Sequence, residues 1–199
     1  MNIGIVGAGA VGSAVATVLA RAGIEAKILN RRGPAAMGPL AAMLAPHVTM
    51  GTRDEVLGAD MVIVAIPWTR LGEALGGRDW AGRIVVDCTN ALEGPSFRPV
   101  DLGGRGSSEA FAADFVPGAR VVKAFNHILP HNLAGDPRSE GGRRVLYMAG
   151  DDGEAKAALA ALIDRTGFYR IDLGGLREGG RMIEFPGGPL PALNMVVFD

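Results

Sequence analysis

The first thirty-two residues carry the pattern that most constrains the fold. A short apolar run at residues 2–6 precedes the turn Gly7-Ala8-Gly9-Ala10-Val11-Gly12, and a helical pattern then covers residues 13–22. A strand, a G-x-G-x-x-G turn and a helix in this order are typical of a dinucleotide-binding unit. Gly7 permits the sharp turn, Gly9 leaves room for a pyrophosphate, and Gly12 lets the helix pack closely on the sheet. The sequence therefore predicts a dinucleotide site at this turn.

The end of the next strand indicates which dinucleotide binds. A second apolar strand is expected at residues 24–29, and it ends at Asn30-Arg31-Arg32. An NAD site usually has Asp or Glu here to accept from the ribose 2′-hydroxyl, whereas guanidinium groups suit a 2′-phosphate. We therefore predict NADP(H) as the cofactor. The alternative is a tight turn with merely solvated arginines, but it does not explain why the acidic residue is missing.

Composition excludes several classes of protein. The 199 residues carry 20 basic and 21 acidic side chains, a net charge of −1, so no overall field attracts nucleic acid or an anionic membrane. Cys88 is a single cysteine in an apolar strand, and a small buried residue explains it. No basic leader opens the chain, and no apolar run approaches the roughly 18 residues of a membrane span. We expect a cytoplasmic protein.

Strand and helix patterns alternate along the rest of the chain. We expect a Rossmann-type α/β fold, that is, a doubly wound, mostly parallel sheet, with a small C-terminal helical lobe. The predicted domains are residues 1–172, which bind NADP, and residues 173–199. The stretch 91–108 is rich in proline and glycine, and we expect it to be a lid or a loop on the substrate side. Buried strands are expected at residues 61–66, 83–86, 120–125, 143–149 and 168–171, and helices at residues 35–45, 52–57, 109–115, 154–165 and 176–183.

Several candidate site residues follow the carboxyl ends of the expected strands, where ligands bind in an open parallel sheet. Ile66, Pro67 and Trp68 end one strand and are candidates to line the cofactor crevice, although Trp68 would serve equally as a packed indole. Asn90 follows the next strand, where it could hydrogen-bond a ribose or an amide, or simply shape a turn.

A third strand end carries the candidate catalytic residues, Asn126 and His127. An amide or imidazole here could orient the nicotinamide or donate a proton, and the alternative is an ordinary turn before Pro130. We expect Lys123 to extend its stem along the strand with its amine in water. A zinc site is not expected, since Pro130 interrupts the spacing between His127 and the next histidine.

With these residues in view, the chain resembles the NADPH-dependent coenzyme F420 reductase family, also called F420-dependent NADP oxidoreductases. The matching segments, in order, are Gly-Ala-Gly-Ala-Val-Gly, Asn30-Arg31-Arg32, Ile66-Pro67-Trp68, Val122-Lys123-Ala124-Phe125-Asn126, Ala149-Gly150-Asp151-Asp152 and Leu193-Asn194. Where F420-using members have His then Thr, this chain has Asn126 and His127.

The resemblance implies a dimeric Rossmann protein in which NADPH and a deazaflavin ring meet at the strand ends. It implies that Asn30, Arg31 and Arg32 hold the 2′-phosphate, and that residues 126–128 lie beside the reacting rings. Ala124, in the same segment, is assigned to the cofactor site with Asn126. The implied partner is a small-molecule hydride acceptor, either coenzyme F420 or a flavin-like ring.

The same N-terminal pattern is compatible with two other functions. One is an NADPH-dependent reductase of a small imine or carbonyl, but those enzymes add a substrate domain, for which residues 173–199 leave little room unless a dimer partner completes the pocket. The other is a non-catalytic NADPH-sensing module. In either case the apolar tail at residues 190–198 could form a dimer interface, although packing back onto its own core is the commoner outcome.

Overall fold

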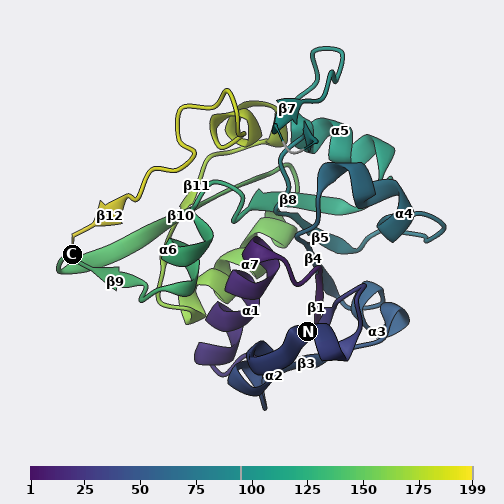
Figure 1. The fold of residues 1–199 in the computed structure, drawn as a ribbon. Coiled ribbons are helices and arrows are strands. Elements are labelled where there is room, and N and C mark those ends of the chain that lie inside the picture. The colour runs from purple at the N-terminus through teal and green to yellow at the C-terminus, as the bar shows by residue number, and fades with distance from the viewer. Residues whose placement is uncertain (95, 199) are drawn as a thin grey trace.

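The computed structural model describes residues 1–94 and 96–198, and a twisted sheet forms its centre (Figure 1). The strands lie in the order β11-β10-β8-β5-β4-β1-β2-β3. Their bounds are β1 (Ile3–Val6), β2 (Ala26–Leu29), β3 (Val48–Met50), β4 (Met61–Val64), β5 (Ile84–Asp87), β8 (Arg120–Ala124), β10 (Gly142–Gly150) and β11 (Tyr169–Asp172).

The strand directions confirm the doubly wound, mostly parallel sheet. All strands from β3 to β8 in that order run parallel, with β1 central between β2 and β4. β10 is antiparallel to β8, and β11 is parallel to β10. The carboxyl ends of β1, β2, β4, β5 and β8 therefore lie along one edge of the sheet, where ligands bind in folds of this kind.

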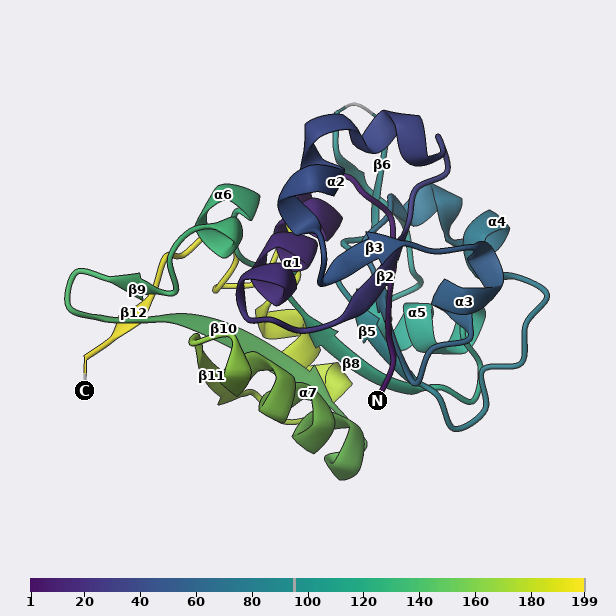
Figure 2. The ribbon, with the colours of Figure 1, turned by 90° about the horizontal axis from the view of Figure 1, so that it is seen from below.

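Helices cover both faces of the sheet (Figure 2). Because both faces are covered, the central strands are buried along their whole length, which explains the continuous apolar run of β4. One face is covered by α1 (Ala10–Arg21), α2 (Gly38–Leu44), α6 (Pro130–Ala134) and α7 (Gly153–Arg165). The other face is covered by α3 (Arg53–Leu57), η2 (Trp68–Arg70), α4 (Leu71–Leu75) and α5 (Ser107–Asp114). A 3-10 turn, η1 (Pro34–Met37), precedes α2.

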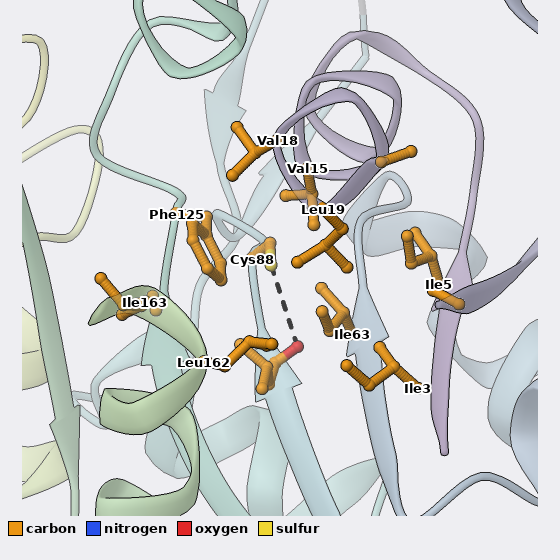
Figure 3. Close-up of a cluster of buried hydrophobic side chains, with 14 of the residues drawn as sticks. Ile3, Ile5, Val15, Val18, Leu19, Ile63, Cys88, Phe125, Leu162 and Ile163 are labelled. Atoms are coloured by element: carbon orange, nitrogen blue, oxygen red, sulfur yellow. Dashed lines mark hydrogen bonds between the residues drawn. The ribbon is translucent and has the colours of Figure 1, made fainter. Parts of the chain in front are cut away.

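The larger apolar cluster fixes α1 against the sheet. Ile5 and Ile63 point from adjacent strands towards Val15 and Leu19 of α1, and all four are at most 2% exposed (Figure 3). Cys88 lies in the same cluster, as expected of a small buried residue. Burial raises the pKa of its thiol well above the usual value, so the thiol is protonated. This packing anchors the helix whose N-terminus borders the glycine turn.

Polar side chains set where two helices begin. Thr52 forms the expected capping box with Glu55: the Thr52 hydroxyl accepts from the Glu55 amide at 3.3 Å, and the Glu55 carboxylate accepts from the Thr52 amide at 2.7 Å. Asp152 accepts from the Ala155 amide at 2.7 Å at the start of α7. These caps satisfy backbone N–H groups that would otherwise lack partners.

The C-terminal segment folds back onto β10, the strand next to the edge strand β11. It contains a short helical turn, η3 (Leu176–Gly180), and β12 (Val196–Val197), which pairs with β10. Ile183 is fully buried against Val145 and Tyr147 of β10. A short strand, β9 (Arg138–Ser139), also pairs with β10. The tail therefore packs on its own chain.

The segment between β5 and α5 contains a small hairpin of β6 (Leu92–Glu93) and β7 (Arg98–Pro99). The side chain of Phe97 at its tip is 66% exposed. Pro95 lies outside the described residues, and the role of this segment as a lid stays a prediction. Within the described part of the chain, no helix combines the length and apolar character needed to cross a membrane.

Candidate cofactor and substrate site

The glycine turn lies between β1 and α1 and is closely packed on one side only. Gly7 has a φ of +102°, and a Cβ there would lie 2.5 Å from the Ala65 carbonyl oxygen. A Cβ on Gly12 would lie 1.9 Å from the Gly7 carbonyl oxygen. A Cβ on Gly9, the N-cap of α1, would meet no atom within 4 Å. The first N–H groups of α1 are thus open to an anion at Gly9.

The turn after β2 presents the two arginines. The Asn30 side-chain oxygen accepts from the Arg32 amide at 3.1 Å, and the Asn30 carbonyl accepts from the Gly33 amide at 2.9 Å. Both arginine residues are exposed. Among the described residues, neither guanidinium is paired with a carboxylate. Asn30 therefore shapes the turn, and Arg31 and Arg32 keep their charges available to a ligand.

A pocket of about 540 Å³ joins the two turns. It runs from the glycine turn to the arginines and along the end of β4, so it has the shape expected for the adenosine and pyrophosphate part of a dinucleotide. Its lining residues are Val6, Gly7, Ala8, Gly9, Leu29, Asn30, Arg31, Arg32, Arg53, Ala65, Ile66, Pro67, Arg70, Glu73 and Ala74.

Farther along the same edge, two asparagines connect the ends of β5 and β8. Asn126 donates from Nδ2 to Oδ1 of Asn90 at 3.0 Å, and Asn90 donates from Nδ2 to the Asn126 carbonyl at 3.3 Å. The C-terminal segment closes on this pair: the Ile183 carbonyl accepts from Asn126 Nδ2, and the Phe185 amide donates to Asn90 Oδ1 at 3.1 Å. Oδ1 of Asn126 is buried without a hydrogen-bond partner among the described residues.

Comparison with known proteins identifies the family. Residues 2–91 match the family described as coenzyme F420-dependent NADP oxidoreductase. A putative F420-dependent NADP-reductase from Arthrobacter sp. FB24, known from a crystal structure, is 31% identical to this chain and superposes with a TM-score of 0.71. The match covers 88% of this chain and 86% of the Arthrobacter chain. The chain belongs to the coenzyme F420-dependent NADP oxidoreductase family. It is an NADP-dependent oxidoreductase.

Other structures extend the comparison. A hypothetical protein from Sinorhizobium meliloti is 42% identical, with a TM-score of 0.91 and coverage of 99% of this chain and 96% of that one. A reductive aminase from Aspergillus terreus in complex with NADPH and ethyl levulinate has a TM-score of 0.61 at 21% identity, which shows a shared fold. The match covers 89% of this chain but 56% of the aminase. No curated protein matched the chain.

In this oxidoreductase most of the sequence-predicted cofactor residues gather at the pocket. Ile66 and Pro67 line it, as do the first three residues of the glycine turn. Ala10 and Val11 form the first turn of α1. Trp68 is different: its indole packs edge-on against Phe115, with ring centroids 5.3 Å apart, in the apolar cluster under α4. For Trp68, the structure shows the packed indole.

Two pocket residues, Arg53 and Arg70, were not anticipated from the sequence. Arg53 Nη2 donates to the carbonyls of Ala74 at 3.0 Å and Gly76 at 3.3 Å, so it ties α3 to α4. Arg70 pairs with Glu73 at 2.7 Å. Both arginines sit at helix starts, where no local motif distinguishes a ligand-binding side chain from a solvated one. Arg53 adds positive charge to the pocket, whereas the charge of Arg70 is balanced by Glu73, which also lines the pocket.

The structure places His127 in the core, contrary to a role as proton donor. Its ring is 2% exposed and packs on Tyr147, with ring centroids 5.0 Å apart. Its Nε2 accepts a hydrogen bond from the Tyr147 amide at 3.2 Å. Burial, with a smaller contribution from the nearby charge of Lys123, lowers the pKa of His127 to about 3. The imidazole is therefore neutral at physiological pH.

Ala124, at the end of β8, is also fully buried.

This buried histidine should make stability depend on pH. The folded pKa lies below the unfolded value of 6.5, so the unfolded chain binds the proton first and stability falls as the pH drops below about 6.5. The slope rises towards about 1.4 kcal/mol per pH unit below pH 6.5, so the loss between pH 7 and pH 5 is about 2 kcal/mol. Urea unfolding of the wild type and of His127→Gln between about pH 7 and pH 5 should show this additional loss in the wild type only. Equal slopes in both proteins would contradict the assignment.

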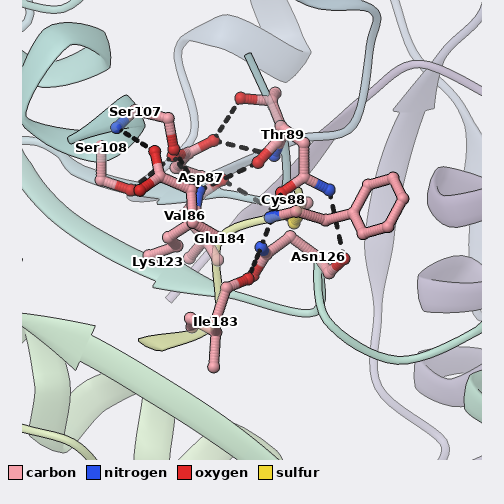
Figure 4. A network of polar contacts seen from close by, with 12 residues as sticks. Val86, Asp87, Cys88, Thr89, Ser107, Ser108, Lys123, Asn126, Ile183 and Glu184 are labelled. Carbon is pink, nitrogen blue, oxygen red and sulfur yellow. Dashed lines mark hydrogen bonds and ion pairs between the residues drawn. The ribbon is translucent and has the colours of Figure 1, made fainter. Parts of the chain in front are cut away.

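Lys123 corrects a further expectation. Its amine does not reach water: the side chain is fully buried, and Nζ lies 3.0 Å from Oδ2 of Asp87 (Figure 4). The sequence suggested an amine in water because the strand alone shows no partner for the charge of Lys123. The carboxylate comes from β5, and only the fold brings it there.

Proposed function

We propose that the protein transfers a hydride between NADP(H) and the ring of a second bound substrate, either coenzyme F420 or a flavin-like ring. The cofactor part of this proposal is supported by the pocket between the glycine turn and Arg31 and Arg32, which have no carboxylate partner among the described residues. The family and the name of the Arthrobacter relative support the acceptor. We further propose that the protein acts as a homodimer in the cytoplasm.

The chain's residues fit the cofactor at each step along the pocket. Arg31 and Arg32 would bind the 2′-phosphate, with Asn30 holding their turn in place. The open side of Gly9 would admit the pyrophosphate against the N-terminus of α1. Ile66 and Pro67 would line the path towards the nicotinamide. This division of roles predicts that phosphate selectivity and hydride transfer depend on different residues.

Asn126 is the residue we propose to orient the nicotinamide. Its Oδ1 is a buried acceptor whose partner is missing from the described residues, and leaving such an atom unpaired has a cost. The carboxamide N–H of the nicotinamide is a donor of the required kind. Asn90 holds the Asn126 amide through the 3.0 Å hydrogen bond and so fixes the direction in which Oδ1 points.

The polar groups at these strand ends favour a ring acceptor over an imine or carbonyl. The bound cofactor supplies the hydride, and the protein supplies position. Reduction of an imine or carbonyl also requires a well-placed proton donor. At the described ends of β5 and β8 the polar side chains are the two amides, the neutral, buried His127, the Asp87 carboxylate, and Thr89 and Lys123, whose donors are engaged within the protein. Amides can orient two stacked rings about 3–3.5 Å apart, and they do not donate catalytic protons.

The test is a comparison of acceptors. Purified protein is mixed with NADPH and, separately, with F420, a flavin and a small cyclic imine, and the nicotinamide absorbance is followed. We expect oxidation of NADPH with F420 or the flavin. With F420 and 4-deuterated NADPH, deuterium should appear on the reduced deazaflavin, which shows direct transfer. Oxidation of NADPH with the imine but not with F420 or the flavin would favour a reductase of small imines or carbonyls. Tight NADPH binding without oxidation by any of the three would identify a sensor.

A further inference from the structure

The ends of β5 and β8 are joined by a buried ion pair that the proposed mechanism does not use. Asp87 and Lys123 are direct partners in the parallel register of the two strands, and both side chains are fully buried. Burying two charges costs several kcal/mol per ion before they pair, and an apolar pair in the same place is often as stable. The ion pair is therefore poorly explained by stability alone.

Every strong hydrogen-bonding position of the pair is used (Figure 4). Lys123 Nζ donates to Asp87 Oδ2 at 3.0 Å, to the Thr89 carbonyl at 2.9 Å and to Ser107 Oγ at 3.2 Å. Asp87 Oδ1 accepts from the amide and hydroxyl of Thr89 at 2.8 and 2.7 Å, and Oδ2 accepts from Ser108 Oγ at 2.9 Å. Because all three N–H groups of Lys123 are engaged inside the core, its ammonium has no proton to offer a substrate.

These contacts fix the chain just before the two asparagines. Asp87 and Lys123 each stand three residues ahead of an asparagine, namely Asn90 and Asn126. The backbone of Thr89 is hydrogen-bonded on both sides, since its amide donates to the Asp87 carboxylate and its carbonyl accepts from the Lys123 ammonium. The direction in which the chain leaves β5, and hence the position of Asn90, is thereby set by the ion pair.

The same network reaches the segment that closes on the asparagines. Ser107, which accepts from Lys123, has its amide bound by the Glu184 carboxylate. Glu184 lies between Ile183 and Phe185, whose backbone groups contact the Asn90 and Asn126 amides. One buried charge pair thus connects β5, β8, the start of α5 and the C-terminal segment.

We propose that Lys123 and Asp87 are positioning residues for hydride transfer, because they hold the Asn90–Asn126 amide pair in the register that orients the nicotinamide. The inference rests on the proposed function. Neither side chain touches a substrate, and both act through the backbone of Thr89 and the strand register. Since a misplacement of about 1 Å can cost about 100-fold in rate, this fixed geometry matters more for the reaction than for binding.

The decisive variant is the double substitution Asp87→Leu with Lys123→Met. Removing one partner alone would leave an unpaired buried charge, whereas an apolar pair of similar size leaves only neutral groups of Thr89, Ser107 and Ser108 without these hydrogen bonds, which costs less. We expect the double variant to fold and to bind NADPH within about threefold of the wild type, since most of that affinity comes from the phosphate pocket. Its single-turnover hydride transfer should fall by about 10- to 100-fold, approaching that of Asn126→Ala.

Two further variants keep the test decisive. Thr89→Val keeps the branched shape of the side chain but loses the Oγ hydrogen bond to Asp87, and it should reduce the single-turnover rate by a few-fold at unchanged NADPH affinity. Arg120→Met breaks an ion pair with Asp152 at the opposite end of β8, so it should lower thermal stability without changing the rate. Wild-type rates in the folded double variant and in Thr89→Val would overturn the proposal. If the wild type reduced no acceptor at all, the proposed function would fail instead.

Discussion

Replacing Arg31 and Arg32 together by alanine should weaken NADPH binding by roughly 100-fold or more and leave NADH binding nearly unchanged. Each guanidinium would lose a charge-assisted hydrogen bond to the 2′-phosphate, worth about 1.5–3 kcal/mol. Each 1.4 kcal/mol is a factor of ten in affinity. Neither side chain has a carboxylate partner in the described structure, so their removal leaves no unpaired charge behind. Isothermal titration calorimetry with both nucleotides measures the effect directly.

Arg70 provides a matched control in the same pocket. Its charge is already balanced by Glu73 at 2.7 Å, so Arg70→Ala should weaken NADPH binding by less than about tenfold. The comparison separates a bound phosphate from general positive charge. If NADH lost as much affinity as NADPH in the double variant, or if Arg70→Ala had the larger effect, the assignment of the 2′-phosphate to Arg31 and Arg32 would be wrong.

Local signals predicted most of the fold. The central strands β1 and β4 are continuous apolar runs, and Thr52 marks the start of α3. What the sequence did not show was the direction of β10, which runs antiparallel to β8. An apolar run has the same composition in either direction, and the direction depends on how the chain between the strands packs. The hairpin with β9 and the pairing with β12 also join residues that have no local signature.

The same reasoning explains which parts of the site could be foreseen. The glycine turn and the Asn30–Arg32 corner are contiguous in sequence, so a pattern was sufficient to locate their pocket. Arg53 and Arg70 join that pocket from two separate helices and were missed. Lys123 and His127 were misjudged for the opposite reason. Their burial depends on distant partners, Asp87 for the lysine and Tyr147 for the histidine, which the sequence does not place beside them.

Gly9→Val should abolish detectable binding of NADPH and of NADH alike while the protein stays folded. The backbone of Gly9 has a φ of −78° and a ψ of −168°, an extended conformation that valine adopts readily. Its added side chain would meet no protein atom within 4 Å at Cβ, and would instead fill the space proposed for the pyrophosphate. Loss of the N-cap preference costs about 1 kcal/mol, so the melting temperature should fall by only about 2–4 °C.

Gly12, the last glycine of the turn, should give the contrasting result, because its Cα faces protein and not the proposed ligand. A Cβ on Gly12 would lie 1.9 Å from the Gly7 carbonyl oxygen, so Gly12→Ala must push α1 away from the turn and should lower stability by about 1–3 kcal/mol or more. Thermal melts and nucleotide titrations of the two variants test both statements. Normal NADPH binding by a folded Gly9→Val protein would show that the pyrophosphate does not approach this turn. The pocket would then have to serve another ligand.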